Sequence, residues 1–157
     1  AAWAAEVADA RVSLLTQPNR GPGAARNLGI ARSCGEYLAF LDADDLWLPD
    51  KLERQIAYLD AHPEVGLVHT SITMVDERGA RLRRDIIAHG HGRLWREIAA
   101  YNPYYSVLCG STPMVRRACF AEVGVFDATL PLSQDWEMWI RIAGAFEFGT
   151  LAAPLVA

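Results

Sequence analysis

The sequence predicts an α/β fold in which a mixed, mostly parallel sheet is flanked by helices. Residues 36–41 (EYLAFL) form a short, apolar, aromatic-rich run, which is typical of a strand buried on both faces in a parallel sheet. Residues 65–75 and 81–87 indicate two further strands joined by a hairpin turn, because residues 76–79 (DERG) are turn formers. Since helical patterns alternate with the early strands, parallel strands should predominate and the hairpin should add antiparallel ones.

The helices are predicted from breakers and apolar spacing. Pro49 is favoured at the first position of a helix, and Leu52, Ile56 and Leu59 follow at helical spacing until Pro63 ends the segment. Further helices are predicted over residues 1–10, from the turn-rich loop 19–23 to about residue 34, over residues 94–100 and over residues 134–143. Further strands are predicted over residues 11–16 and 112–116, and a short helix follows the second of them.

One domain is expected over residues 1–157, because the 157 residues match an ordinary domain and show no repeats or low-complexity linkers. A doubly wound α/β domain normally begins with a central strand and its first helix. The first ten residues (AAWAAEVADA) instead indicate the end of a later helix. We therefore expect this domain to be incomplete at its N-terminus.

Composition excludes several classes of protein. Hydrophobic residues make up 52% and charged residues 22%, as in a globular protein, and the net charge of −4 argues against nucleic-acid binding. The densest basic stretch, residues 78–84 (RGARLRR), is more typical of a solvated hairpin than of a phosphate or lipid contact. No apolar run reaches the roughly 18 residues that a membrane helix needs. The three cysteines have no metal-ligand spacing, which indicates reduced thiols and a cytoplasmic protein.

Three carboxylates follow the predicted buried strand: Asp42, Asp44 and Asp45. Ligands of open α/β sheets bind outside the carboxyl ends of the strands, so a site is expected here. Two carboxylates about 6 Å apart repel each other by ~3 kcal/mol at an effective dielectric of ~20. Mg²⁺ or Mn²⁺ would offset that repulsion, especially where substrate phosphates complete the coordination. Alternatively, one carboxylate caps the next helix and the others are solvated.

Two blocks of sequence together carry a resemblance to a known family. The first is residues 19–47 (NRGPGAARNLGIARSCGEYLAFLDADDLW), and the second combines residues 123–127 (VGVFD) with residues 133–141 (SQDWEMWIR). Their order and spacing, over residues 11–155, resemble the N-x-G, A-R-N-x-G, G-E-Y, D-x-D, G-x-F-D and E-D-W-x-L-W-x-R segments of family 2 glycosyltransferases. The resemblance implies the GT-A fold and a metal-assisted, inverting transfer of a sugar from a nucleotide-diphosphate donor to an acceptor hydroxyl.

The resemblance also implies roles for individual residues. Asp42 would contact the ribose or sugar of the donor, Asp44 would bind the Mg²⁺ or Mn²⁺ that bridges its diphosphate, and Asp135 would be the general base. Asn19 and Arg26 match positions where the family's loop and helix approach the nucleotide, although Arg26 fits a structural role equally well. The acceptor would be a saccharide, a lipid or a protein, and a lipid would bring peripheral contact with the inner face of the membrane.

The surroundings of Asp135 leave alternatives open. Glu137 is a rival base, but helix positions i and i+2 point in different directions, which favours Asp135. Gln134 stands where the family usually has Glu, so the charge beside the base differs. Trp136 and Trp139 are candidates to raise the pKa of the base by excluding water, although Trp139 is more typical of core packing.

Two other kinds of protein are also considered. One is a non-catalytic nucleotide-sugar-binding fragment that is inactive without its missing N-terminal strand. The other, a sugar-nucleotide pyrophosphorylase, would need a Gly-rich, basic phosphate loop at the N-terminus, which the sequence lacks. His89 and His91 fit a surface loop better than a metal site.

Overall fold

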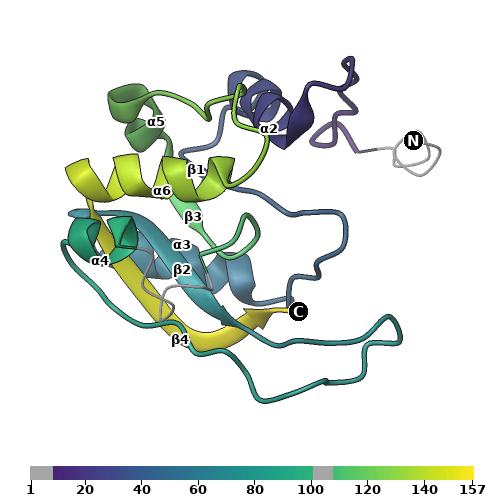
Figure 1. Ribbon diagram of the computed structural model, residues 1–157, viewed down its shortest axis with the longest axis vertical. Coiled ribbons are helices and arrows are strands. Elements are labelled where there is room, and N and C mark those ends of the chain that lie inside the picture. Colours follow the sequence, from purple (N-terminus) through teal and green to yellow (C-terminus); the bar gives the residue numbers. More distant parts are fainter. Residues whose placement is uncertain (1–8, 101–107) are drawn as a thin grey trace.

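In a computed structural model, which describes residues 9–100 and 108–157, the chain forms a sheet with helices on both faces (Figure 1). The helix predicted over residues 1–10 lies almost wholly outside the described residues. The sheet has four strands in the order β1-β3-β2-β4. Their bounds are β1 (Tyr37–Ala39), β2 (Val65–Ile72), β3 (Met114–Arg116) and β4 (Glu147–Val156).

The strand directions confirm the predicted mixed sheet. Strands β2 and β4 are parallel, and β3 is antiparallel to both β1 and β2. Strands β1, β2 and β4 therefore run in one direction and β3 runs in the other. Because β1 and β2 point the same way, the acidic turn after β1 and the chain after β2 leave the sheet at one edge.

The helices occupy the two faces of the sheet in unequal numbers. The bounds are α2 (Gly21–Arg32), α3 (Lys51–Ala61), α4 (Trp95–Ala99), α5 (Arg117–Val123) and α6 (Gln134–Ala145). Figure 1 shows α6 in front of the sheet, with α4 and α5 beside it, and α3 behind. The predicted helices around residues 24–34, 49–61, 94–100 and 134–143 are thus confirmed.

Two separate cores follow from the alternation of side chains along the strands. Leu38, Leu67, Val115 and Phe148 point to one face, where they pack with residues of α6 such as Trp139. Their strand neighbours point to the other face and pack under α3: Tyr37, Ala39, Val68, Met114 and Leu151. Trp139 is fully buried, as expected for core packing.

Helix α3 buries a different stripe from the predicted one. Leu52 and Ile56 are 40% and 38% exposed, whereas Lys51, Gln55 and Leu59 are fully buried. All three buried residues are four positions apart, so they share one face of the helix. The apolar spacing predicted the helix correctly but not its rotation, because the polar ends of Lys51 and Gln55 hydrogen-bond each other inside the protein.

Residues 11–16, which we predicted as a strand, are not one. They are exposed, and two of the apolar side chains, Val12 and Leu14, are 41% and 54% exposed. An isolated extended segment leaves its backbone groups without partners, and no strand of the described part of the chain pairs with it. The second predicted hairpin strand, residues 81–87, is reduced to two isolated bridges, Ile72 to Ile86 and Val75 to Arg81.

Two side chains join the motif blocks that lie far apart in the sequence. The amide of Asn27 on α2 donates to the Phe126 carbonyl (2.8 Å) and accepts from the Phe126 N–H (2.9 Å). Arg141 on α6 donates to the carbonyls of Val123 and Val125 at 2.5 and 2.9 Å. The chain that leaves α5 is therefore fixed over residues 123–126 to both α2 and α6.

We expect Asn27→Ala to destabilise the fold by about 1–3 kcal/mol, because the buried Phe126 backbone loses both partners. Urea unfolding measures the change. Arg32→Ala, at the exposed end of the same helix, is the control and should change stability by less than about 0.5 kcal/mol. Equal effects of the two substitutions would contradict this role of Asn27.

Candidate active site

The acidic segment after β1 is a turn held from one side by Ser111. The Asp45 N–H donates to the Asp42 carbonyl (3.2 Å), which closes the turn. The Asp42 N–H donates to Ser111 Oγ (2.9 Å), and Trp47 Nε1 donates to the Ser111 carbonyl (2.9 Å). A single buried residue next to β3 therefore fixes both ends of the turn.

The end of β4 holds the turn from the other side. Leu46 and Ala157 exchange backbone hydrogen bonds of 2.6 and 2.9 Å, and the Leu48 N–H donates to the Leu155 carbonyl (3.0 Å). The short antiparallel pairing leaves the carboxylates of the turn on a rigid base. Such a base is what a site needs if its charged groups are to keep one geometry.

Asp42 forms an ion pair with Arg26 of α2. Arg26 Nη2 lies 2.7 Å from Asp42 Oδ1, and the Arg26 side chain is only 10% exposed. The guanidinium also lies over the Phe126 ring, 5.6 Å from its centroid. Arg26 Nη1 is buried and has no hydrogen-bond partner among the described residues, which costs about 1–3 kcal/mol.

Two cavities flank the acidic turn. A groove of about 390 Å³ runs between α2 and the end of β1, and its walls include Pro22, Arg26, Phe40 and Asp42. A smaller cavity of about 130 Å³ is lined by Asp44, Asp45, Ile72, Thr73, Met74, Val75, Cys109, Val156 and Ala157. Asp42 and Asp44 therefore border different hollows on the two sides of one turn.

Asp135 lies in the first turn of α6 and is half-buried. Its Oδ1 accepts a hydrogen bond from the Trp136 N–H (2.8 Å), and the first turn of a helix favours a negative charge. The start of α6 lies against α2, because a Cβ atom at Gly23 would lie 3.6 Å from Gln134 Cγ. Neither of the two cavities is lined by Asp135.

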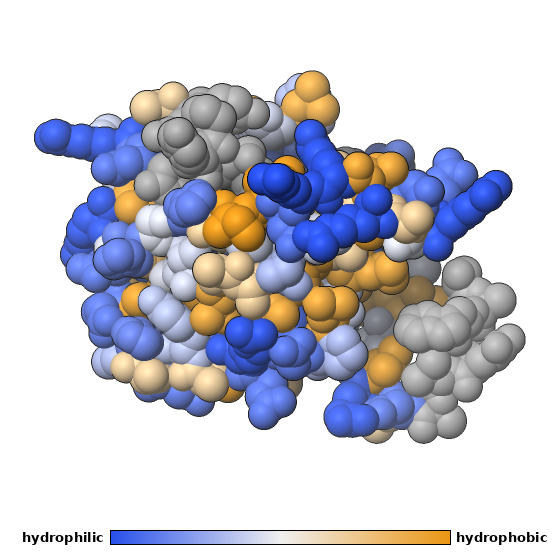
Figure 2. All heavy atoms as spheres, turned by 90° about the horizontal axis from the view of Figure 1, so that it is seen from below, coloured by the Kyte–Doolittle hydropathy of each residue, from blue (hydrophilic) through white to orange (hydrophobic). Residues whose placement is uncertain are grey.

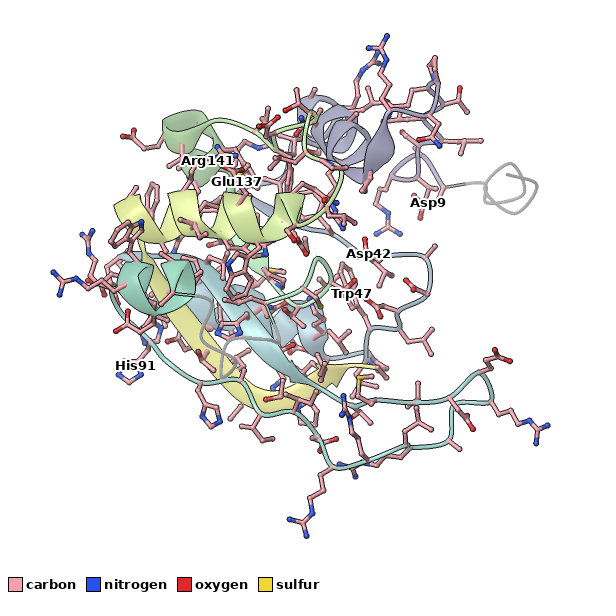
Figure 3. All side chains as sticks on the ribbon, viewed as in Figure 1. Asp9, Asp42, Trp47, His91, Glu137 and Arg141 are labelled. Atoms are coloured by element: carbon pink, nitrogen blue, oxygen red, sulfur yellow. The ribbon has the colours of Figure 1, made fainter. Side chains whose placement is uncertain are left out.

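The carboxylate of Glu137, the rival base, is held in an ion pair with Arg141. Its two oxygens accept hydrogen bonds from Arg141 Nε (2.6 Å) and Nη2 (2.8 Å), and Figure 3 shows the two side chains together. A carboxylate held through both of its oxygens has less freedom to receive an acceptor hydroxyl than one without an arginine partner. This contact favours Asp135 over Glu137 as a base.

Asn19 lies at the start of α2 and is exposed. Its Oδ1 accepts a hydrogen bond from the Gly21 N–H (3.0 Å). Gly21 has φ +81°, a conformation that suits glycine, so Asn19 and Gly21 together open the helix. The contact explains the N-x-G spacing structurally.

The described residues contain no group of three or more His, Cys, Asp and Glu side chains that would hold a metal ion by themselves. Mg²⁺, however, is usually bound by one or two carboxylates, with water and substrate phosphates completing its shell. The exposed Asp44 fits that pattern, because it offers free carboxylate oxygens beside a cavity.

Lys51 is a site residue that the sequence did not reveal. It is fully buried behind the acidic turn, where Nζ donates to Gln55 Oε1 (2.7 Å) and lies 4.3 Å from the centroid of the Trp47 ring. Gln55 Nε2 in turn donates to the carbonyls of Val68 and Thr112, both at 2.9 Å. Burial lowers the pKa of Lys51 to about 8. A helix spacing predicts such a lysine to be solvated, so only the fold identifies it.

With this geometry in place, comparison with known proteins defines the class. Residues 1–124 match the family model described as glycosyl transferase family 2. The chain therefore belongs to glycosyl transferase family 2. This finding agrees with the resemblance carried by the two sequence blocks.

Individual relatives are similar over most of the chain. An uncharacterized glycosyltransferase of Rickettsia bellii is 32% identical over 147 residues, which cover 94% of this chain and 20% of the relative. The amylovoran biosynthesis glycosyltransferase AmsE of Erwinia amylovora is 29% identical over 127 residues, covering 80% of this chain and 45% of AmsE. The chain thus spans less than half the length of either relative.

Solved structures share the fold. The crystal structure of S. aureus TarS 1-349 superposes with a TM-score of 0.63 at 19% identity, covering 87% of this chain and 39% of that one. Its complex with UDP-GlcNAc gives a TM-score of 0.62 at 20% identity, covering 90% and 42%. The likeness confirms the predicted fold class.

The surface seen in Figure 2 carries hydrophobic residues in several small groups among hydrophilic ones. Within residues 9–100 and 108–157, no helix combines the length and hydropathy needed to cross a bilayer.

We expect the stability contributed by Lys51 to depend on pH. Its pKa is about 8 in the folded chain and 10.5 ordinarily, so between these values the unfolded chain binds more protons. The free energy of unfolding should therefore rise with pH across that range, by on the order of 3 kcal/mol relative to Lys51→Met. Urea unfolding of both proteins from pH 7 to pH 10.5 measures the difference. A difference that does not change with pH would show that Lys51 is not buried as a cation.

Proposed function

We propose that this chain forms the donor-binding part of an inverting, metal-assisted glycosyltransferase that moves a sugar from a nucleotide diphosphate to an acceptor hydroxyl. The observation that carries the proposal is the Arg26–Asp42 ion pair on the wall of a groove. Its buried Arg26 Nη1 has no partner among the described residues, and an acceptor atom of a ligand would remove that cost. An anionic, oxygen-rich donor meets this requirement.

The nucleotide-sugar class of donor is supported by the fold. TarS has been crystallised with UDP and with UDP-GlcNAc, and those ligands belong to TarS alone. In this chain, Asp42 would accept hydrogen bonds from the ribose or sugar hydroxyls, and Arg26 would donate to the donor. Asn19, at the opening of α2, would approach the nucleotide from the rim of the groove.

The metal role is assigned to Asp44. A bound Mg²⁺ or Mn²⁺ would stabilise the negative charge that develops on the leaving diphosphate. Asp44 would hold that ion through its free carboxylate, while Asp42 stays paired with Arg26. The two carboxylates of the D-x-D motif thus have different roles, because only one of them already has a cationic partner.

Asp135 is assigned as the general base. The acceptor hydroxyl oxygen attacks the anomeric carbon from the face opposite the diphosphate, the bond to the diphosphate oxygen breaks, and the hydroxyl proton passes to the Asp135 carboxylate. The configuration at the anomeric carbon is inverted. Glu137 does not compete, because its carboxylate is held by Arg141.

The acceptor is assigned more broadly. The name of AmsE refers to the biosynthesis of a polysaccharide, amylovoran, which supports a saccharide acceptor for this chain as well. A lipid or a protein acceptor remains an alternative, and a lipid would bring the chain to the cytoplasmic face of a membrane.

A second candidate function is donor binding without catalysis, which is favoured by the absence of Asp135 from the walls of both cavities described above.

We expect Asp135→Asn to abolish transfer while leaving donor binding intact. Loss of a general base typically costs ~10²–10⁴-fold in rate. Sugar transfer from UDP-GlcNAc and other nucleotide sugars is measured by release of the nucleoside diphosphate. Glu137→Gln is the matched control and should lower the unfolding temperature but keep most of the rate. Full transfer by Asp135→Asn would refute the assignment, and donor binding with no transfer by the unmodified chain would favour the second function.

We expect Asp44→Asn to remove the effect of Mn²⁺ on nucleotide binding. In titration calorimetry with UDP, Mn²⁺ should tighten binding to the unmodified chain at least about tenfold, which is about 1.4 kcal/mol. The variant should bind UDP equally with and without the ion. Asp50→Asn, an exposed position paired with Arg54, is the control. An undiminished Mn²⁺ effect in Asp44→Asn would exclude Asp44 as the metal ligand.

A further inference from the structure

The segment Gly110–Ser111 contacts the donor-site charges without being charged itself. We propose that Gly110 and Ser111 are positioning residues that fix the Asp42 carboxylate against Arg26 in the orientation that receives the donor. The inference builds on the proposed function, because it names what holds the donor-site carboxylate in place. Neither residue belongs to the motif blocks that revealed the family.

Gly110 leaves no room for a side chain. A Cβ atom at this position would lie 2.5 Å from Arg26 Nη2, 2.8 Å from Asp42 Oδ2 and 3.2 Å from Arg26 Cζ. These are the two groups that form the ion pair. The absence of a side chain at Gly110 is therefore a condition for the pair to form with its present geometry.

The two obstructed side chains differ in how freely they can move. Arg26 is 10% exposed and its guanidinium lies over the Phe126 ring, so its movement is limited by packing. Asp42 is 41% exposed and would be displaced more easily. A methyl group at position 110 should therefore break the ion pair by turning Asp42 rather than unfold the chain.

Ser111 fixes the backbone of the same aspartate. Its Oγ accepts from the Asp42 N–H, and its carbonyl accepts from Trp47 Nε1. Asp42 is thus held at its backbone by Ser111 and at its carboxylate by Arg26, with Gly110 between them. With its backbone fixed, Asp42 has only its two side-chain torsions to vary, and in the present structure the contact with Arg26 sets both of them.

Other tight glycines differ in what they touch. A Cβ atom at Gly66 would meet Phe146 and Cys119, and one at Gly149 would meet Tyr58. Those neighbours belong to or pack against the two cores, so the glycines serve packing alone. Of these three, Gly110 is the one whose neighbours are a proposed pair of ligand-binding charges.

The test uses Gly110→Ala and Ser111→Ala in the full chain. Gly144→Ala is the control, because that exposed helix position has only ordinary contact with Trp95 at 3.5 Å. The first readout needs no ligand: NMR of the Arg26 guanidinium reports whether the ion pair persists. We expect the Arg26 guanidinium resonance of Gly110→Ala to match that of Asp42→Asn, and the resonance of Gly144→Ala to match that of the unmodified chain.

The second readout is binding of UDP with Mn²⁺. Gly110→Ala and Ser111→Ala should each weaken it about tenfold or more, and Gly110→Ala should have an unfolding temperature close to that of Gly144→Ala. In a background that carries both Arg26→Ala and Asp42→Ala, Gly110→Ala should weaken binding no further, because both obstructed side chains are gone. The Michaelis constant for the donor should rise more than the turnover number falls.

Several outcomes would overturn the proposal. An intact Arg26 signal in Gly110→Ala would show that the glycine does not position the pair, whether or not any nucleotide binds. Unchanged UDP binding despite a lost ion pair would show that the pair does not serve the donor. Failure of the unmodified chain to bind any nucleotide diphosphate would instead refute the proposed function, and the NMR comparison would still decide whether Gly110 holds Asp42.

Discussion

The pairing of the Asn27 amide with the backbone of Phe126 is the contact on which the arrangement of the site depends. It joins α2, which carries Arg26, to the loop that leads into α6, whose first turn contains Asp135. The Asn27 amide bonds both the N–H and the carbonyl of the buried Phe126, as a neighbouring strand would. Without the amide, both of these backbone groups would lack a hydrogen-bond partner. Two segments a hundred residues apart thereby become one structural unit, with Phe126 also packed against the Arg26 guanidinium.

The charges around the acidic turn follow a consistent pattern. Arg26 neutralises Asp42 from the side of α2, and the buried Lys51 lies behind Trp47 on the far side of the turn. Arg26 lowers the cost of keeping Asp42 close to the other two carboxylates, since opposite charges at short range offset the repulsion. Asp44 has no such partner in the part of the chain that the structure describes. This difference is the physical basis for assigning the metal to Asp44 and the donor hydroxyls to Asp42.

The sequence predicted the elements whose signals are local. The helix after Pro49 and the helix starting at Gln134 follow from composition and spacing, and the structure has them. The strand predicted over residues 36–41 is present as β1, but its predicted burial on both faces in a parallel sheet is wrong, because β1 is an edge strand whose partner among the described strands is the antiparallel β3. Failures arose where tertiary contacts decide: residues 11–16 pair with no strand among the described residues, and α3 turns Lys51 rather than Leu52 to the interior. Gly110 gave no local signal at all, because its lack of a side chain matters only once Arg26 and Asp42 meet there.

Crystals of the chain grown with UDP and MnCl₂ would test most directly whether the two motif blocks form one site. Anomalous scattering should locate a single Mn²⁺ on the Asp44 carboxylate, with the nucleotide beside the Arg26–Asp42 pair and the Asp135 carboxylate facing the same hollow. Mn²⁺ and nucleotide bound at another surface, or bound at the acidic turn with Asp135 directed away from them, would contradict a common donor and base site.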